Sequence, residues 1–151
     1  MSTARVAHWT PEYGPAVPGQ MRRAVRAKLT EWGARPDDGA LLALDVTVSE
    51  LVTNAIKFGG VIGRLDLFLY LDDETMTVEV WDGEGPTQPH IPDADDHDES
   101  GRGLHLVNTL VERLWCTRDG CEFAKKVCAE IPLTTPARTA DHPRPSALAT
   151  A

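Results

Sequence analysis

A polar pair inside an otherwise apolar segment is the first place in this sequence where chemistry is expected. Glu50 and Asn54 lie four residues apart within the segment SELVTNAIKF, residues 49–58. On a helix, residues at this spacing project from the same face. An amide oxygen is a suitable magnesium ligand, and a carboxylate one turn away can hold a metal-bound water or accept a proton from a hydroxyl group. Taken alone, such a pair is more often a solvated or helix-capping pair than a binding site. The prediction of a site therefore depends on further residues elsewhere in the sequence.

Two later segments add an acid and a helix start that is suited to phosphate. Asp82 ends a strand-like stretch, and Gly83 and Gly85 after it would let a ligand approach the backbone. The segment SGRGL, residues 100–104, leads into a helical pattern, where free N–H groups and the helix dipole favour phosphate. Its candidate residues are Gly101, Arg102, Gly103 and Leu104. The order of these pieces along the chain is much more specific than any one of them.

The elements that must position these residues are predicted from the spacing of apolar side chains. Recurrence every three or four residues predicts helices over 20–32, 37–58 and 103–115. Alternation predicts strands over 64–71 and 75–81, joined as an antiparallel hairpin, and further strands over 115–118 and 123–131. Residues 6–9 fit a short edge strand. Asp37 or Asp38 is expected to cap the second helix.

The chain divides into three parts. Residues 1–14 form an N-terminal segment, residues 15–131 the folded domain, and residues 132–151 a tail rich in Pro, Ala and Thr that is expected to be disordered. Within the domain, residues 83–101 have no apolar period and contain a run of five acids from Asp93 to Glu99. A long segment of this kind is typical of a functional lid or a disordered loop.

The composition excludes several classes of protein. The 151 residues are 42% hydrophobic and 25% charged, as expected for one globular domain. A net charge of −8 argues against nucleic acid as the main partner. Apolar runs end before the roughly 20 residues of a membrane-spanning helix, and no secretion signal is recognised, so the cytoplasm is the expected compartment. Cys116, Cys121 and Cys128 lack zinc-site spacing and are expected to be reduced thiols.

Three segments together resemble a known family. SELVTNAIKF, VEVWDGEGP and SGRGLHLVNTLVERL, in this order and spacing, are similar to the nucleotide-binding boxes of the GHKL superfamily, which includes gyrase, heat-shock chaperones, histidine kinases and MutL. SELVTNAI and GRGLHLV particularly resemble the single-domain anti-sigma factor serine kinases and related actinobacterial regulators. The resemblance covers about residues 15–131. It implies an α/β sandwich (α+β) with a mixed, mostly antiparallel sheet covered on one face by helices, a Bergerat-type fold that holds ATP between helices and lid.

The resemblance also implies a role for each matching residue. Asn54 would ligate the magnesium ion that bridges the ATP phosphates, and Glu50 would be the general base that activates the attacking hydroxyl. Asp82 would accept a hydrogen bond from the adenine amino group. Lys57 is interpreted mainly as a helix-end cation, with contact to phosphate as the alternative.

The glycine residues of the last box carry the remaining implied roles. Gly101 and Gly103 would form, with Arg102, the lid hinge and the phosphate cradle, and Arg102 would add positive charge there. Magnesium and ATP are therefore the cofactors that the resemblance implies.

The sequence departs from the family pattern in two boxes. Glu84 stands where the family usually has the middle glycine of its first glycine box. In the last strand, Ala124 replaces a glycine and Lys126 replaces a threonine that helps to bind adenine. A lysine beside adenine, together with an acidic lid near a triphosphate, weakens the expectation of ordinary ATP affinity.

Two functions from different classes remain open. The first is a magnesium-dependent serine/threonine kinase that acts as an anti-sigma factor, phosphorylates an anti-sigma-factor antagonist and sequesters a sigma factor. The second is a non-catalytic ATP-sensing module for protein interaction, which the altered boxes favour. The catalytic half of a sensor histidine kinase is disfavoured, because no helical hairpin with a phospho-acceptor histidine is recognised. Family resemblance suggests a homodimer or a heteromeric complex, and the charge and hydropathy above predict no direct nucleic-acid or membrane partner.

Overall fold

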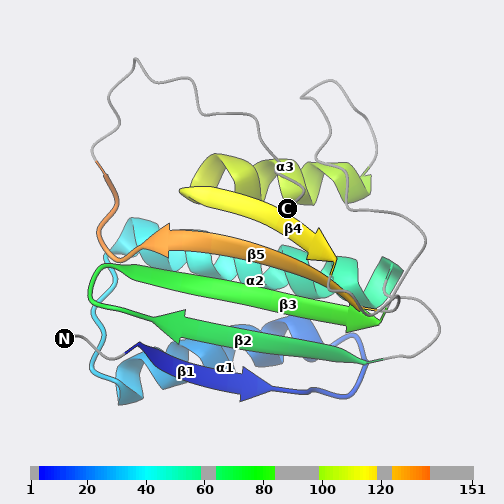
Figure 1. Ribbon diagram of the computed structural model, residues 1–151, viewed down its shortest axis with the longest axis horizontal. Coiled ribbons are helices and arrows are strands. Elements are labelled where there is room, and N and C mark those ends of the chain that lie inside the picture. Colours follow the sequence, from blue (N-terminus) through cyan, green and yellow to red (C-terminus); the bar gives the residue numbers. More distant parts are fainter. Residues whose placement is uncertain (1–3, 59–63, 84–98, 119–123, 137–151) are drawn as a thin grey trace.

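A five-stranded sheet with helices on one face forms the part of the chain that the structure describes (Figure 1). The structure is a computed structural model and describes residues 4–58, 64–83, 99–118 and 124–136. The elements are β1 (Arg5–Trp9), α1 (Val17–Glu31), α2 (Asp38–Phe58), β2 (Leu65–Leu71), β3 (Thr75–Gly83), α3 (Glu99–Leu110), β4 (Arg113–Arg118) and β5 (Ala124–Pro132). The predicted α+β sandwich is confirmed.

The sheet has the strand order β1-β2-β3-β5-β4. Each neighbouring pair of described strands is antiparallel, so the parallel component expected from the family resemblance is not found there. The predicted hairpin of β2 and β3 is confirmed, and the expected edge strand is β1. Insertion of β5 between β3 and β4 brings the last strand of the chain against the end of β3.

The core lies between the sheet and the helices. In β2, buried and half-buried residues alternate, and Leu65, Leu67 and Leu69 are fully buried. In Figure 1 the helices lie behind the sheet, with α2 crossing behind its middle strands. Because side chains alternate between the two faces of a strand, the buried row of each strand packs toward the helices.

The long helix α2 is the central helix of this core. Its residues Asp38–Lys57 are long and apolar enough to cross a membrane by length and composition alone. However, Val48, Val52 and Ala55 are at most 1% exposed within the fold. The core helix of a domain passes the same test of length and hydropathy, so the apolar character of α2 is accounted for by packing.

The cap of α2 follows the prediction and also attaches the chain after β5. Asp37 Oδ1 accepts a hydrogen bond from the Ala40 N–H at 2.8 Å, and the Thr135 hydroxyl donates to the same carboxylate at 2.6 Å. These hydrogen bonds, first that from Thr135, lower the pKa of Asp37. Residues up to Thr135 therefore contact the domain, while residues 137–151 of the predicted tail lie outside the described residues.

The prediction of a helix over 103–115 is wrong at both ends. The helix α3 starts at Glu99 and ends at Leu110, and β4 begins at Arg113. The Glu112 N–H donates to the Glu130 carbonyl oxygen of β5 at 2.9 Å. At residue 112 the backbone is therefore hydrogen-bonded to the neighbouring strand and no longer within the helix. Leu114 and Cys116 are both buried two residues apart, which fits a strand.

The described cysteines are buried thiols in strands. Cys116 of β4 and Cys128 of β5 form no disulfide within the described residues, and Cys121 lies outside them. Burial, together with the nearby Glu79 carboxylate, raises the pKa of Cys128 to about 12. The Cys128 thiol is therefore protonated at neutral pH and is a poor nucleophile.

Candidate functional site

The helix α2 presents Glu50 and Asn54 on one face, and both side chains are half-buried. Arg22 of α1 donates a hydrogen bond to the Ser49 hydroxyl at 2.6 Å, which ties α1 to the residue before Glu50. Among the described residues, neither the Glu50 carboxylate nor the Asn54 amide has a hydrogen-bond partner. Within the described ranges, the oxygen atoms of this pair are therefore available to a ligand.

Gly103 of α3 lies directly against Glu50. A Cβ atom on Gly103 would lie 2.0 Å from Glu50 Oε2 and 2.8 Å from its Cδ. Only a residue without a side chain therefore allows α3 to come this close to the carboxylate. The contact joins the first and last of the predicted site segments, which are far apart in the sequence.

The predicted hinge before α3 is wrong in one respect. Because α3 begins at Glu99, Gly101 and Gly103 lie inside the helix together with Arg102, rather than in front of it. The first turn of a helix still has free backbone N–H groups, and these belong to residues 99–102. A phosphate cradle at this place would therefore be formed by the helix terminus itself, with Arg102 exposed beside it.

Asp82 lies near the end of β3 and is buried. The β-ladder places it opposite Leu65 of β2 and Lys125 of β5. Asp82 Oδ2 lies 3.4 Å from Lys125 Nζ, whereas Asp82 Oδ1 has no hydrogen-bond partner among the described residues. Burial raises the pKa of Asp82, and the Lys125 ammonium opposes this rise. An unpartnered buried carboxylate oxygen is costly, and a ligand that donates a hydrogen bond would relieve that cost.

Tyr13 links the end of α2 to the neighbourhood of Asp82. Its hydroxyl donates to the Arg64 carbonyl oxygen at 3.2 Å and lies 3.4 Å from the Ala55 carbonyl oxygen, one residue after Asn54. Burial raises the pKa of Tyr13, and the charge of Asp82 raises it further. Tyr13 therefore joins the backbone of the last turns of α2 to Arg64, the residue before Leu65, which pairs with Asp82 across the β2–β3 ladder.

The lysine that approaches Asp82 is not the one that the sequence comparison indicated. Lys126 lies over the Trp81 ring, 5.0 Å from its centroid, and 4.0 Å from Glu79. In the register of β3 and β5, Trp81 and Lys126 are partners, as are Asp82 and Lys125. Successive residues of a strand face opposite sides of the sheet, so Lys125 is the residue on the side of Asp82.

The other predicted site residues differ in how accessible their side chains are. Lys57 is exposed in the last turn of α2, as its interpretation as a helix-end cation requires. Leu104 is 4% exposed and belongs to the core, so only its backbone is available to a ligand. Gly83 ends β3, and Gly85 lies outside the described residues, as does Glu84.

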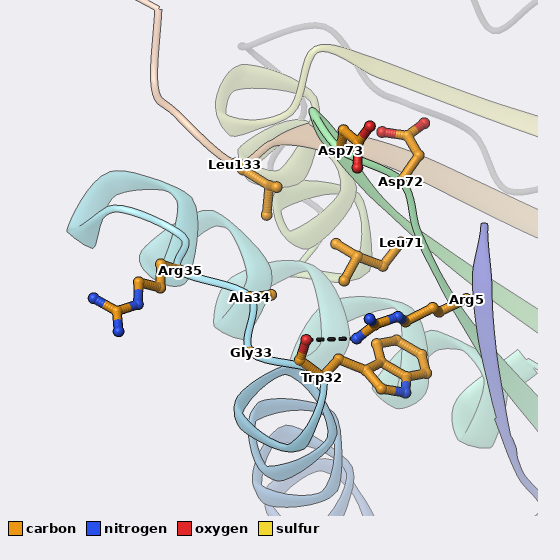
Figure 2. A pocket seen from close by; sticks show the side chains of 9 residues that line it. All are labelled: Arg5, Trp32, Gly33, Ala34, Arg35, Leu71, Asp72, Asp73 and Leu133. Carbon is orange, nitrogen blue, oxygen red and sulfur yellow. Dashed lines mark hydrogen bonds between the residues drawn. The ribbon is translucent and has the colours of Figure 1, made fainter. Parts of the chain in front are cut away.

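A separate cavity lies at the opposite end of the strands. Its volume is about 480 Å³, and Arg5, Trp32, Leu71, Asp72 and Leu133 are among the residues that line it. In Figure 2 the Arg5 guanidinium donates to the Trp32 carbonyl oxygen. This cavity borders the turn between β2 and β3, whereas Asp82 is at the other end of β3. It contains none of the predicted site residues.

Metal binding by the described side chains alone is not indicated. In the ranges that the structure describes, no group of three or more His, Cys, Asp or Glu side chains is arranged to hold a metal ion. Magnesium, however, is commonly bound by one or two protein oxygens together with substrate phosphates. The free amide oxygen of Asn54 fits that kind of shared coordination.

Two residues of the site were not predicted. Lys125 alternates with Val127, Ala129 and Ile131, all of which are buried, so strand alternation already places its side chain on the core face. Tyr13 stands alone in a segment rich in Pro and Gly, and no local pattern connects it to the distant Asp82.

The chain was compared with known families and structures. A family model described as the histidine kinase-like ATPase domain matches residues 14–125. The catalytic domain of histidine kinase ThkA, in a nucleotide-free form, is 14% identical with a TM-score of 0.49, over 85% of this chain and 99% of that chain. Similarity at this level carries no argument about function. No curated protein matches the chain.

Proposed function

Since the chain belongs to the histidine kinase-like ATPase domain family, we propose that it binds magnesium–ATP and phosphorylates a serine or threonine of a partner protein. One arrangement carries the proposal. Glu50 and Asn54 lie half-buried on one face of α2 with no side-chain partner among the described residues, and Gly103 brings the start of α3 against Glu50. The unpartnered oxygen of Asp82 lies at the same end of the fold, where Tyr13 links the two sides.

Each end of this arrangement suits a different part of a nucleotide. Asp82 Oδ1 accepts a hydrogen bond from the amino group of adenine, which relieves its buried, unpaired state. The Asn54 amide oxygen is a hard ligand for magnesium. Backbone N–H groups in the first turn of α3 would bind phosphate. The nucleotide supplies the phosphoryl group, and magnesium neutralises charge during its transfer.

Glu50 is proposed as the general base. Its carboxylate is half-buried and has no described hydrogen-bond donor, so it is available to accept the proton of an incoming hydroxyl group. The close approach of Gly103 places the Glu50 carboxylate against the start of α3. The chain therefore positions the base, while the partner supplies the hydroxyl.

The proposed partner is an anti-sigma-factor antagonist, with a sigma factor as the second ligand of the same protein. The support is the similarity of SELVTNAI and GRGLHLV to the anti-sigma factor serine kinases. Phosphorylation adds about two negative charges to the partner, and this change at an interface would release one complex in favour of another. The cytoplasm is the proposed compartment.

A second candidate function is ATP sensing without transfer. The observation that favours it is the altered last-strand box, in which Ala124 and Lys126 stand where the resembled kinases have glycine and threonine. Glu84 in the first glycine box favours it as well. In this case nucleotide binding alone would change the affinity for a protein partner.

Phosphotransfer is tested with γ-labelled magnesium–ATP and the antagonist protein that co-purifies with this chain. The proposal predicts label on a serine or threonine of the antagonist, located by mass spectrometry. Saturable ATP binding without label on the antagonist would instead support the sensing function.

Gly103→Ala is expected to separate stability from catalysis. The added methyl group overlaps Glu50 Oε2, so the carboxylate must rotate away from its position. Alanine is favoured over glycine in a helix by about 1 kcal/mol, which offsets the cost of this rotation. We therefore expect a melting temperature within a few degrees of wild type and at least about a tenfold loss of phosphotransfer, since base geometry is disturbed. Unchanged phosphotransfer would show that the contact does not position Glu50.

A further inference from the structure

The ion pair between β3 and β5 is buried without being satisfied. The side chains of Lys125 and Asp82 are only 5% and 4% exposed. Their nearest charged atoms are 3.4 Å apart, whereas charge-assisted hydrogen bonds are about 2.7–2.9 Å long. Asp82 Oδ1 has no described partner, and the Lys125 ammonium, with its three donors, has only Asp82 among the described residues.

Stability does not account for such a pair. Removal of two charges from water costs free energy that their attraction repays only when geometry and additional hydrogen bonds are good. Here the contact is long and one carboxylate oxygen is unpaired. The pair instead presents an acceptor, Asp82 Oδ1, beside a donor, the Lys125 ammonium. A ligand that offers a donor next to an acceptor would satisfy both groups.

Adenine has this pattern. Its amino group is a donor that lies beside ring nitrogens, N1 on one side and N7 on the other, which accept hydrogen bonds. The N7 edge of guanine presents two acceptors and no donor. That edge would satisfy Lys125 and leave Asp82 Oδ1 unpaired. The opposite edge of guanine carries N1–H beside O6, so adenine is assigned here through the proposed ATP site and not through this pattern alone.

We infer that Lys125 is a second base-reading residue, whose ammonium donates a hydrogen bond to a ring nitrogen of adenine while Asp82 accepts one from the amino group. The inference rests on the proposed nucleotide site. Lys126, the neighbouring lysine, lies over Trp81 on the other face of the sheet and has no part in it. The chain therefore contains its own matched control.

The experiment measures the affinity of magnesium–ATP and of its 1-deaza and 7-deaza analogues by calorimetric titration. The proteins are wild type, Lys125→Met and Lys126→Met. Wild type should bind one of the two analogues about tenfold more weakly than ATP, because a hydrogen bond from a charged donor is lost. Lys125→Met should bind ATP about tenfold more weakly and no longer distinguish that analogue. Lys126→Met should behave as wild type.

Several results would overturn the inference. Equal affinity of wild type for ATP and both analogues would exclude a hydrogen bond to a ring nitrogen, and this result does not depend on whether Lys125→Met folds. Equal ATP affinity of Lys125→Met and Lys126→Met would exclude Lys125 as a base-reading residue. In both cases ATP still binds, so the proposed function stands. Failure of wild type to bind ATP at all would remove the proposed function and this inference together.

Discussion

Asn54→Ala is expected to abolish the rise in melting temperature that magnesium–ATP produces in the wild-type protein. The Asn54 amide is half-buried and has no hydrogen-bond partner in the described residues, so the substitution should cost the ligand-free fold little. A ligand at 100 times its Kd stabilises a protein by about 2.7 kcal/mol, which is a shift of several degrees for a domain of this size. Loss of the magnesium ligand should remove that shift.

The control for Asn54→Ala is Gln20→Ala. Gln20 is an exposed residue of α1, so this variant removes a carboxamide from a different helix. It should keep the full ATP-dependent shift, measured by differential scanning fluorimetry. An equal shift in wild type and Asn54→Ala would contradict the assignment of Asn54 as the magnesium ligand.

Glu50→Gln is expected to lower phosphotransfer by about a hundredfold or more while leaving ATP affinity within a few-fold of wild type. Glutamine has nearly the same size as glutamate, so the contact with Gly103 is retained. It lacks the basic carboxylate that accepts the proton of the partner hydroxyl. The loss should therefore appear in the rate of transfer, measured with labelled ATP, rather than in binding.

Glu31→Gln provides the matched control for the loss of a carboxylate. Glu31 is an exposed residue at the end of α1, and its partner in the described part of the chain is the nearby Lys28. This variant should transfer phosphate at the wild-type rate. Equal rates for wild type and Glu50→Gln would exclude Glu50 as the general base, even if ATP binding at the site were established.

Much of the scaffold was predictable because local signals agree with the final fold. The helix α2 has an apolar face, the Asp37 cap and a glycine pair after its last residue, and its observed bounds match the prediction. The hairpin of β2 and β3 has both strict alternation and a short turn. The positions of Glu50, Asn54 and Asp82 in the fold follow from the same signals, since each stands on one of these elements. Their roles in ligand binding remain predictions.

The end of α3 was not predictable from periodicity. Apolar residues at 107, 110, 111 and 114 continue a helical spacing, while 114 and 116 also fit a strand. Pairing with β5 decides between them, and this partner lies beyond the local window. Tertiary pairing therefore overrides a local pattern that favours the longer helix.

The residues of the candidate site also depend on tertiary pairing that a local sequence pattern does not encode. The family resemblance sets Lys126 at the place of an adenine-binding threonine and leaves open whether this lysine blocks, tunes or skirts the pocket, a place one residue along from Lys125. In a strand, that single residue changes the face of the sheet, so Lys125 takes the position instead. Tyr13 reaches the start of β2 because the segment before α1 pairs with Arg64 through Glu12, which no local pattern encodes.

A crystal structure with a non-hydrolysable ATP analogue and magnesium is the most direct measurement of whether these residues form one site. We expect the adenine amino group within hydrogen-bond distance of Asp82 Oδ1 and magnesium coordinated by the Asn54 amide oxygen, with the phosphates at the start of α3. An analogue bound instead in the cavity beside Arg5 and Trp32, with Asn54 and Asp82 making no contact to it, would contradict the proposed site.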